Sequence, residues 1–200
     1  SPGQYGAQPP VELLRQVLEY GGVYDSNKLM WTALMNSTLC VAAAPPAGGR
    51  HTLSPRFSRH FSVLNMPAAS DETLRTMFTA IMTGFLQKFA TEIRAIAPML
   101  VSATVAVYSR CQLELLPTPA KSHYTFNLRD VSRVFQGITM VEPDKVTTAH
   151  GAVRLWIHEA MRVFHDRLVT DSDRLWFTTL MTQSLHRFFR LTWSWDDLSG

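Results

Sequence analysis

Apolar and polar residues recur with a helical period over much of the chain, beginning near its N-terminus. Leu13, Leu14, Val17 and Leu18 share one face of a single segment. Two prolines precede that segment, where the first helical turn tolerates them, and two glycines follow it as a stop signal. The pattern therefore predicts a short amphipathic helix, Val11–Tyr20.

A second and much longer apolar stripe follows Ser70. Serine is a good N-cap, and the two acidic residues after it are favourable in a first helical turn. The stripe has the spacing i, i+3, i+4, i+7 and comprises Leu74, Met77, Phe78, Ile81, Met82, Phe85, Leu86 and Phe89. We interpret it as the core-facing side of a helix rather than a cofactor site. Residues 91–116 are also predicted to be helical, with a kink or break at Pro98.

Two short apolar segments are predicted to be β-strands. Ser37–Ala43 carries no charge and contains β-branched residues, which suits a strand buried on both faces. Cys40 within it is therefore expected to be inert. A Pro/Gly-rich loop, residues 44–54, follows this strand, and α/β folds place functional residues in such loops. Phe61–Leu64 is a second, shorter strand candidate.

The C-terminal part of the chain is predicted to be all-helical. Pro117 and Pro119 favour a stiff extended linker, which we interpret as a domain boundary. A helix is expected from Asn127 to Gln136, with Gly137 as its stop. Two further helices are expected, one with an apolar stripe over residues 153–168 and one from Asp171 or Ser172 to Leu191.

The pattern thus indicates an α/β part over residues 1–116 and a helical part over residues 117–200, and the composition fits this division. The chain is 46% hydrophobic and 18% charged, which excludes a disordered protein. Its net charge of +3 is spread evenly, with 9 basic and 7 acidic residues in the first part and 10 and 9 in the second. We therefore expect no nucleic-acid partner. No apolar segment is long and unbroken enough to cross a membrane, so we expect no membrane partner.

The cysteines and the N-terminus indicate the cellular context. Cys40 and Cys111 have no CxxC spacing and favour a reducing compartment. The first ten residues lack the basic and apolar regions of a signal peptide, and the chain does not begin with methionine. We therefore expect it to be a piece of a larger protein.

Motifs for metal and nucleotide chemistry are incomplete in this sequence. His158 and Glu159 begin an HExxH pattern, but arginine stands where the second histidine is needed, so we expect no metal site. The phosphate-binding pattern GxxxxGK[ST] is absent, so we expect no complete nucleotide site. The remaining candidates are three arginines: Arg56 and Arg59 in SPRFSRHF, and Arg129 in NLRD. On spacing alone each is an ordinary surface side chain.

Longer strings give these arginines a context. These strings are YGAQPPVELLRQ, PPAGGR, SPRFSRHFSVLNMP, LLPTPAKSHYTFNLRDVSRVFQGI and LWIHEAMRVFHDRL followed by SDRLWF. Together, and over essentially the whole length of the chain, they resemble the third AAA+ module of a dynein heavy chain. YGAQPP and ELLRQ are most similar to axonemal chains of the inner-arm type.

The resemblance implies an α/β fold of the AAA+ P-loop NTPase class that starts after the magnesium-binding strand. Residues 1–116 would form the last part of the large αβα subdomain, and residues 117–200 an incomplete helical lid. In this family six AAA+ modules on one polypeptide form a ring that uses ATP and Mg²⁺ for minus-end-directed movement along microtubules. The third module binds ATP or ADP and gates release from the microtubule.

The resemblance also implies partners and a location. The expected partners are the neighbouring AAA+ modules of the same heavy chain and, through other parts of the parent, microtubules and dynein intermediate and light chains. The expected location is the axoneme of cilia and flagella, within the cytoplasmic cytoskeleton.

By the same resemblance each arginine acquires a role. Arg59 matches the arginine finger, which would face the nucleotide of the preceding module and stabilise charge on its γ-phosphate. Arg56 is the second choice for that role, and would otherwise brace the interface. Arg129 matches the sensor II position, from which the lid reaches this module's own phosphates and moves when they leave. Ala44 stands where many AAA+ proteins have the sensor I asparagine, so we expect slow or absent hydrolysis here.

Two interpretations follow. The first is a segment of a dynein ATPase motor, which without its phosphate loop is expected to bind ATP poorly and not to hydrolyse it. The second is a non-catalytic structural or protein-interaction module derived from an AAA+ scaffold.

Overall fold

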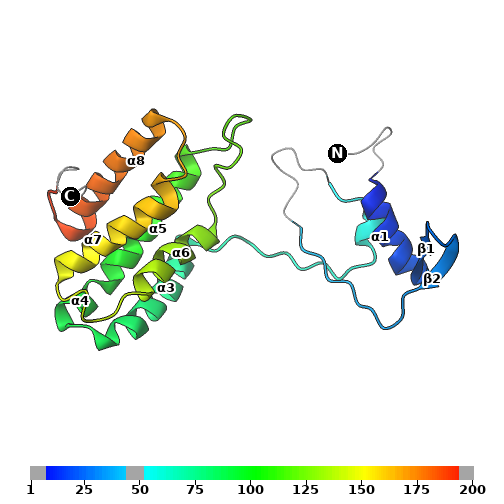
Figure 1. Ribbon diagram of the computed structural model, residues 1–200, viewed down its shortest axis with the longest axis horizontal. Helices are drawn as coiled ribbons and strands as arrows, with labels where there is room; N and C mark the ends of the chain where they lie inside the picture. Colours follow the sequence, from blue (N-terminus) through cyan, green and yellow to red (C-terminus); the bar gives the residue numbers. More distant parts are fainter. Residues whose placement is uncertain (1–7, 44–51, 194–200) are drawn as a thin grey trace. The chain divides into compact units, whose positions relative to one another are not determined.

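The computed structural model describes residues 8–43 and 52–193, and internal contacts divide the chain after Pro67 into two units (Figure 1). This division lies well before residue 117, where the sequence analysis placed a boundary. The helices on both sides of residue 117 pack together in the second unit. The assignment of residues 1–116 and 117–200 to two AAA+ subdomains stays a prediction. Ala44 lies outside the described residues.

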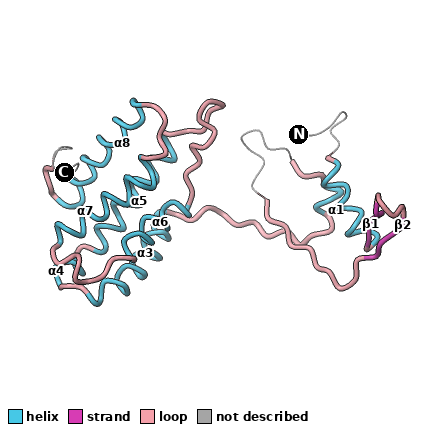
Figure 2. Tube along the Cα trace, in the orientation of Figure 1, coloured by secondary structure: helices cyan, strands magenta, loops and turns pink. Residues whose placement is uncertain are grey.

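Helix α1, Pro9–Tyr20, opens the first unit and confirms the helix predicted there. It ends at Gly21, whose φ of 67° is the left-handed conformation that glycine adopts without strain. Strands β1, Gly22–Asp25, and β2, Met30–Ala33, then form an antiparallel hairpin (Figure 2). The Asp25 carboxylate accepts hydrogen bonds from two backbone amides of the turn. The sequence analysis did not predict this hairpin.

Both predicted strands are wrong. Ser37–Ala43 and Phe61–Leu64 have no strand pairing, and Cys40 is exposed rather than buried. A strand buried on both faces needs neighbours on each side, and within the described part of the chain only β1 and β2 pair as strands. A short helix, α2 (Pro55–Ser58), precedes the second segment and is capped by the Ser54 hydroxyl.

The second unit begins with the predicted helix at Ser70, whose hydroxyl accepts from the Thr73 amide as an N-cap. Helix α3, Asp71–Phe85, ends before the stripe does and continues as a 3₁₀ turn, η2 (Leu86–Lys88). The predicted break near Pro98 is confirmed: α4, Thr91–Ala95, and α5, Ala97–Glu114, meet at Ile96. Proline is in the first turn of α5, where its missing N–H leaves no helical bond unmade.

The predicted extended linker is a tight turn instead. Thr118 and Lys121 form an isolated antiparallel bridge around Pro119, and the Lys121 amide donates to the Thr118 carbonyl at 3.0 Å. Tyr124 and Phe126 are buried just beyond it. Proline restricts the backbone but suits turns as well as extended chain, and the two buried aromatic rings hold this segment against the helices.

The remaining helices follow the predicted order. They are α6 (Leu128–Thr139), α7 (Ala149–Ala160) with the π-helical turn η3 (Met161–His165), and α8 (Asp171–Ser184) with the π-helical turn η4 (Leu185–Phe189). Asn127 caps α6 as predicted, and α8 begins at Asp171, one of the two predicted starts, with Thr170 as its cap. Gly137 does not stop α6, which continues to Thr139, so this prediction is wrong.

Helix α5 lies at the centre of the second unit and contacts α3, α6, α7 and α8 (Figure 1). Phe78 of α3 stacks on Phe135 of α6, with ring centroids 4.6 Å apart. The Trp156 indole N–H of α7 donates to the buried hydroxyl of Thr104 of α5 at 2.8 Å. The predicted stripe on α7 thus supplies the core, and so does the stripe on α3 except at Met77 and Ile81, which are exposed, so the prediction is wrong at these two positions.

Candidate functional site

A capping box at the start of α6 positions Arg129. The Asn127 side chain accepts from the Arg129 amide at 2.9 Å, and the Asp130 carboxylate accepts from the Asn127 amide at 2.9 Å. Because these bonds fix the first turn, Arg129 projects from a defined position at the helix start. Its side chain is exposed, and within the described part of the chain its guanidinium donates no hydrogen bond.

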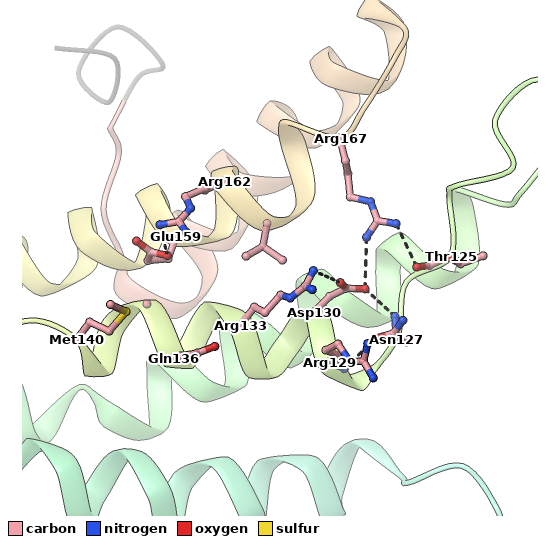
Figure 3. A pocket seen from close by; sticks show the side chains of 12 residues that line it. Thr125, Asn127, Arg129, Asp130, Arg133, Gln136, Met140, Glu159, Arg162 and Arg167 are labelled. Atoms are coloured by element: carbon pink, nitrogen blue, oxygen red, sulfur yellow. Dashed lines mark hydrogen bonds and ion pairs between the residues drawn. The ribbon is translucent and has the colours of Figure 1, made fainter. Parts of the chain in front are cut away.

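Helix α6 and the α7–η3 segment form the two walls of a cleft of about 670 Å³, which we call the arginine cleft (Figure 3). It is lined by Thr125, Asn127, Arg129, Asp130, Arg133, Gln136, Gly137, Met140, Glu159, Arg162, Val163 and Arg167. Four arginines and two carboxylates leave the lining with a net charge of +2. Its volume is in the range of small-ligand sites.

Asp130 forms the base of the cleft at one end. Its side chain is only 5% exposed, and Arg167 lies 3.4 Å from its Oδ2. The same guanidinium donates to the carbonyls of His123, at 2.5 Å, and Thr125, at 3.2 Å, and lies over the ring of Phe126 at 4.8 Å. Arg167 therefore holds the segment before α6 against the end of η3.

Glu159 is the second buried carboxylate, and it lies against Gly137. A Cβ at position 137 would overlap the Glu159 side chain. This close approach explains why glycine stands inside a helix, where it costs about 1 kcal/mol relative to alanine. Arg162 lies 3.7 Å from the Glu159 carboxylate, one turn further along the same wall.

The first unit contains the other two predicted arginines. Arg59 is 59% exposed at the end of α2, and its Nη2 lies 3.0 Å from Oε1 of Glu19 on α1. Its Nε also donates to His60 at 3.4 Å. Arg56 is exposed within α2. Arg56 and Arg59 thus stand one turn apart on one short element, whereas Arg129 belongs to the other unit.

The sequence analysis missed Arg133, Arg162 and Arg167. Arg133 follows Arg129 at i+4, a spacing that places both on one face of α6, and this signal was available. Asp130 follows Asn127 at the capping-box spacing, which was available too. The opposite wall is set by the packing of α7 and η3 against α6, a contact between distant segments.

Residues 8–43 and 52–193 contain no cluster of three or more histidine, cysteine or acidic side chains that could hold a metal ion. None of the described helices is long and apolar enough to span a membrane.

Comparison with known proteins gives two family matches in sequence order. Residues 1–69 match the model of the P-loop containing dynein motor region, and residues 100–197 match that of the AAA+ lid domain. The relatives include human dynein axonemal heavy chain 6, 45% identical over 93% of this chain, and mouse dynein axonemal heavy chain 12, 43% identical over 94%. Human dynein axonemal heavy chain 1 is 42% identical over 92% of it. The chain spans only 4%, 6% and 5% of their respective lengths.

Proposed function

Because this chain belongs to the axonemal dynein heavy chain family and has its AAA+ class of fold, we propose that it serves as one module of an ATP-driven motor ring. We assign it to the third AAA+ module of an inner-arm-type chain, acting on microtubules in the axoneme of cilia and flagella. The observation that carries the proposal is the order of the two family matches, with a motor region followed by a lid on one chain.

In this function Arg129 acts as the sensor II residue. The parent motor would hydrolyse ATP in the presence of Mg²⁺, a reaction that transfers a phosphoryl group to water. Arg129 suits contact with its phosphates because the guanidinium is exposed and its backbone is fixed by the capping box. When that charge leaves, the helix carrying Arg129 loses its attraction to the site, and the lid moves. The module would thereby gate release from the microtubule.

Arg59 acts as the finger toward the preceding AAA+ module. Its ion pair with Glu19 is largely exposed, and such pairs contribute at most about 1 kcal/mol, so the guanidinium can exchange this partner for a phosphate. Arg56, also exposed on α2, is the second choice and would otherwise brace the interface between modules. Contacts with dynein intermediate and light chains would belong to other parts of the parent heavy chain.

The test uses the full-length motor. Arg59→Ala should slow ATP turnover at the preceding module while leaving nucleotide binding largely intact. Arg129→Ala should uncouple the nucleotide state of this module from microtubule release, measured as release rate with ATP and with ADP. Arg75→Ala on α3, an exposed arginine with an ion pair to Asp71, is the matched control.

Two results would contradict the assignments. Unchanged turnover and unchanged release in both variants would remove the roles of Arg59 and Arg129. Micromolar binding of magnesium-ATP by the 200-residue chain alone would contradict the expectation that its nucleotide site is incomplete. A native polypeptide of about the mass of this chain, detected with an antibody to residues 120–200, would favour the structural module instead.

A further inference from the structure

We propose that the arginine cleft is a binding site for a multiply charged phosphate group, held by Arg133 and Arg162. These two residues stand on opposite walls, Arg133 on α6 and Arg162 on η3 (Figure 3). The proposal goes beyond the function above, because it uses neither the finger arginines nor the sensor II residue.

Both guanidiniums have hydrogen-bonding capacity to spare. Arg133 lies 3.9 Å from the Asp130 carboxylate and Arg162 lies 3.7 Å from that of Glu159, both too far for a hydrogen bond. Among the residues that the structure describes, neither side chain donates a hydrogen bond, and they are 59% and 68% exposed. Each guanidinium carries five N–H donors in a planar fork, which matches phosphate oxygens.

The two carboxylates of the lining are outnumbered by its four arginines. Asp130 and Glu159 are nearly buried, at 5% and 8% side-chain exposure. Asp130 is already engaged by the Asn127 amide and by Arg167. Each carboxylate lies near the arginine one turn further along its own wall, and both arginines line the cleft.

The geometry favours phosphate over an acidic protein segment. A helix presents its carboxylates on one face and would reach one wall of the cleft, whereas a compact phosphate exposes oxygens in all directions and can meet both walls. The whole lining, with Arg129 and Arg167 included, has a net charge of +2, which favours an anion as the ligand. The π-helical turn that carries Arg162 is a feature often found at functional sites.

Inorganic tripolyphosphate is the probe, titrated into the 200-residue chain at low ionic strength and followed by backbone amide NMR shifts. We expect saturable one-to-one binding with a Kd on the order of 1 mM, as fits a few charge-assisted bonds without a phosphate loop. The largest shifts should fall at Gly137 and Val163, which line the cleft. If ATP binds with the same affinity as tripolyphosphate, the site recognises phosphate alone. If ATP binds more tightly, its nucleoside also contacts Met140 and Val163. Both results support the site.

The variant pair Arg133→Gln with Arg162→Gln should weaken binding at least about tenfold, as loss of charge-assisted hydrogen bonds predicts. The control pair Arg75→Gln with Arg110→Gln removes the same charge from ion-paired, exposed arginines outside the cleft and should change little. If the first pair fails to fold, Arg133→Lys with Arg162→Lys keeps the charge but loses the fork, and should weaken binding severalfold.

Three results would overturn the proposal: no saturable binding, an equal loss in the test and control pairs, or tighter binding of a glutamate-rich peptide than of tripolyphosphate. The last result would indicate an acidic protein segment as the occupant. All of these measurements leave Arg129 unchanged, so their failure is distinct from failure of the sensor II assignment.

Discussion

The carboxylate of Glu159 on α7 fills the space beside Gly137 that a side chain on α6 would need. The Glu159 side chain packs against α6 here because position 137 has no Cβ. Glu159 is buried, and Arg162 lies 3.7 Å from its carboxylate. A single glycine therefore makes room for the carboxylate that one wall of the arginine cleft presents to the other.

Gly137→Ala is expected to destabilise the chain. Alanine favours a helix by about 1 kcal/mol over glycine, but its Cβ would push the Glu159 side chain out of its buried position. Such overpacking costs about 1–3 kcal/mol, so the clash should prevail. Gly84→Ala on α3 is the matched control, because a Cβ there meets no atom within 4 Å, and it should stabilise by about 0.5–1 kcal/mol. Urea unfolding measures both. Two variants of equal stability would contradict the steric argument.

Thr104→Val is expected to destabilise by about 1–3 kcal/mol, because it leaves the buried Trp156 indole N–H without its acceptor. The size of the side chain is nearly unchanged, so a cavity does not explain the loss. Ser184→Ala on α8 is the control, since within residues 8–43 and 52–193 this buried hydroxyl bonds only to the Leu180 carbonyl of its own helix. It should cost less in the same chemical unfolding experiment. A smaller loss for Thr104→Val than for Ser184→Ala would count against the Trp156 bond.

Asp173 should make stability depend on acid pH. Burial acts to raise its pKa, but hydrogen bonds from Lys121, Thr170 and Tyr124 and the charge of Lys121 together lower it. A carboxylate with a lowered pKa stabilises the fold above its unfolded pKa, near 4, and this contribution is lost as pH falls through the lower, folded value. Asp173→Asn should therefore be clearly less stable than the wild type near neutral pH.

The difference between wild type and Asp173→Asn should shrink as the pH is lowered below about 4, when unfolding free energies are compared across the range. Asp171→Asn is the control, because the Asp171 side chain is fully exposed. A constant difference between wild type and Asp173→Asn at all pH values would mean that the loss comes from geometry and not from charge.

The two cysteines should react at very different rates. Cys40 is exposed, whereas burial raises the pKa of the Cys111 thiol to about 12 and its side chain is inaccessible. A thiol reagent at about pH 8 should therefore label one cysteine in the folded chain and the second only after denaturant is added. Cys40→Ser should remove the fast phase. Fast labelling of both thiols in the folded chain would contradict the burial of Cys111.

The helices were predictable because their signals are local. Ser70 and Asn127 cap helices, Pro98 interrupts one, and the apolar stripes have the helical period. Strands were not predictable in the same way. Ser37–Ala43 could form a buried strand only with neighbouring strands to cover it, and the local sequence does not show whether such neighbours exist. Gly137 was misread because its neighbour is Glu159, 22 positions away in the chain.

The candidate site was predictable only in part. The resemblance to a family drew attention to Arg129 in the string NLRD, whereas Arg133 and Arg162 look like ordinary surface residues with an acidic partner three positions before. Their common cleft depends on the packing of η3 against α6, a contact between distant segments. Local patterns therefore identify the elements, and tertiary packing decides which charges share a volume.

The π-helical turn at Met161–His165 affects the direction in which the side chains after it point. Each of its turns takes up one residue more than an α-helical turn, and one residue corresponds to about 100° of rotation around the axis. Deletion of one residue here would therefore restore the α-helical pitch and leave the downstream residues close to their present orientation, with Arg167 still facing Asp130 and the carbonyl of Thr125. Insertion of one residue would instead rotate everything downstream by about that angle, and the loop before α6 would lose its anchor. This segment should therefore tolerate the loss of one residue better than the gain of one.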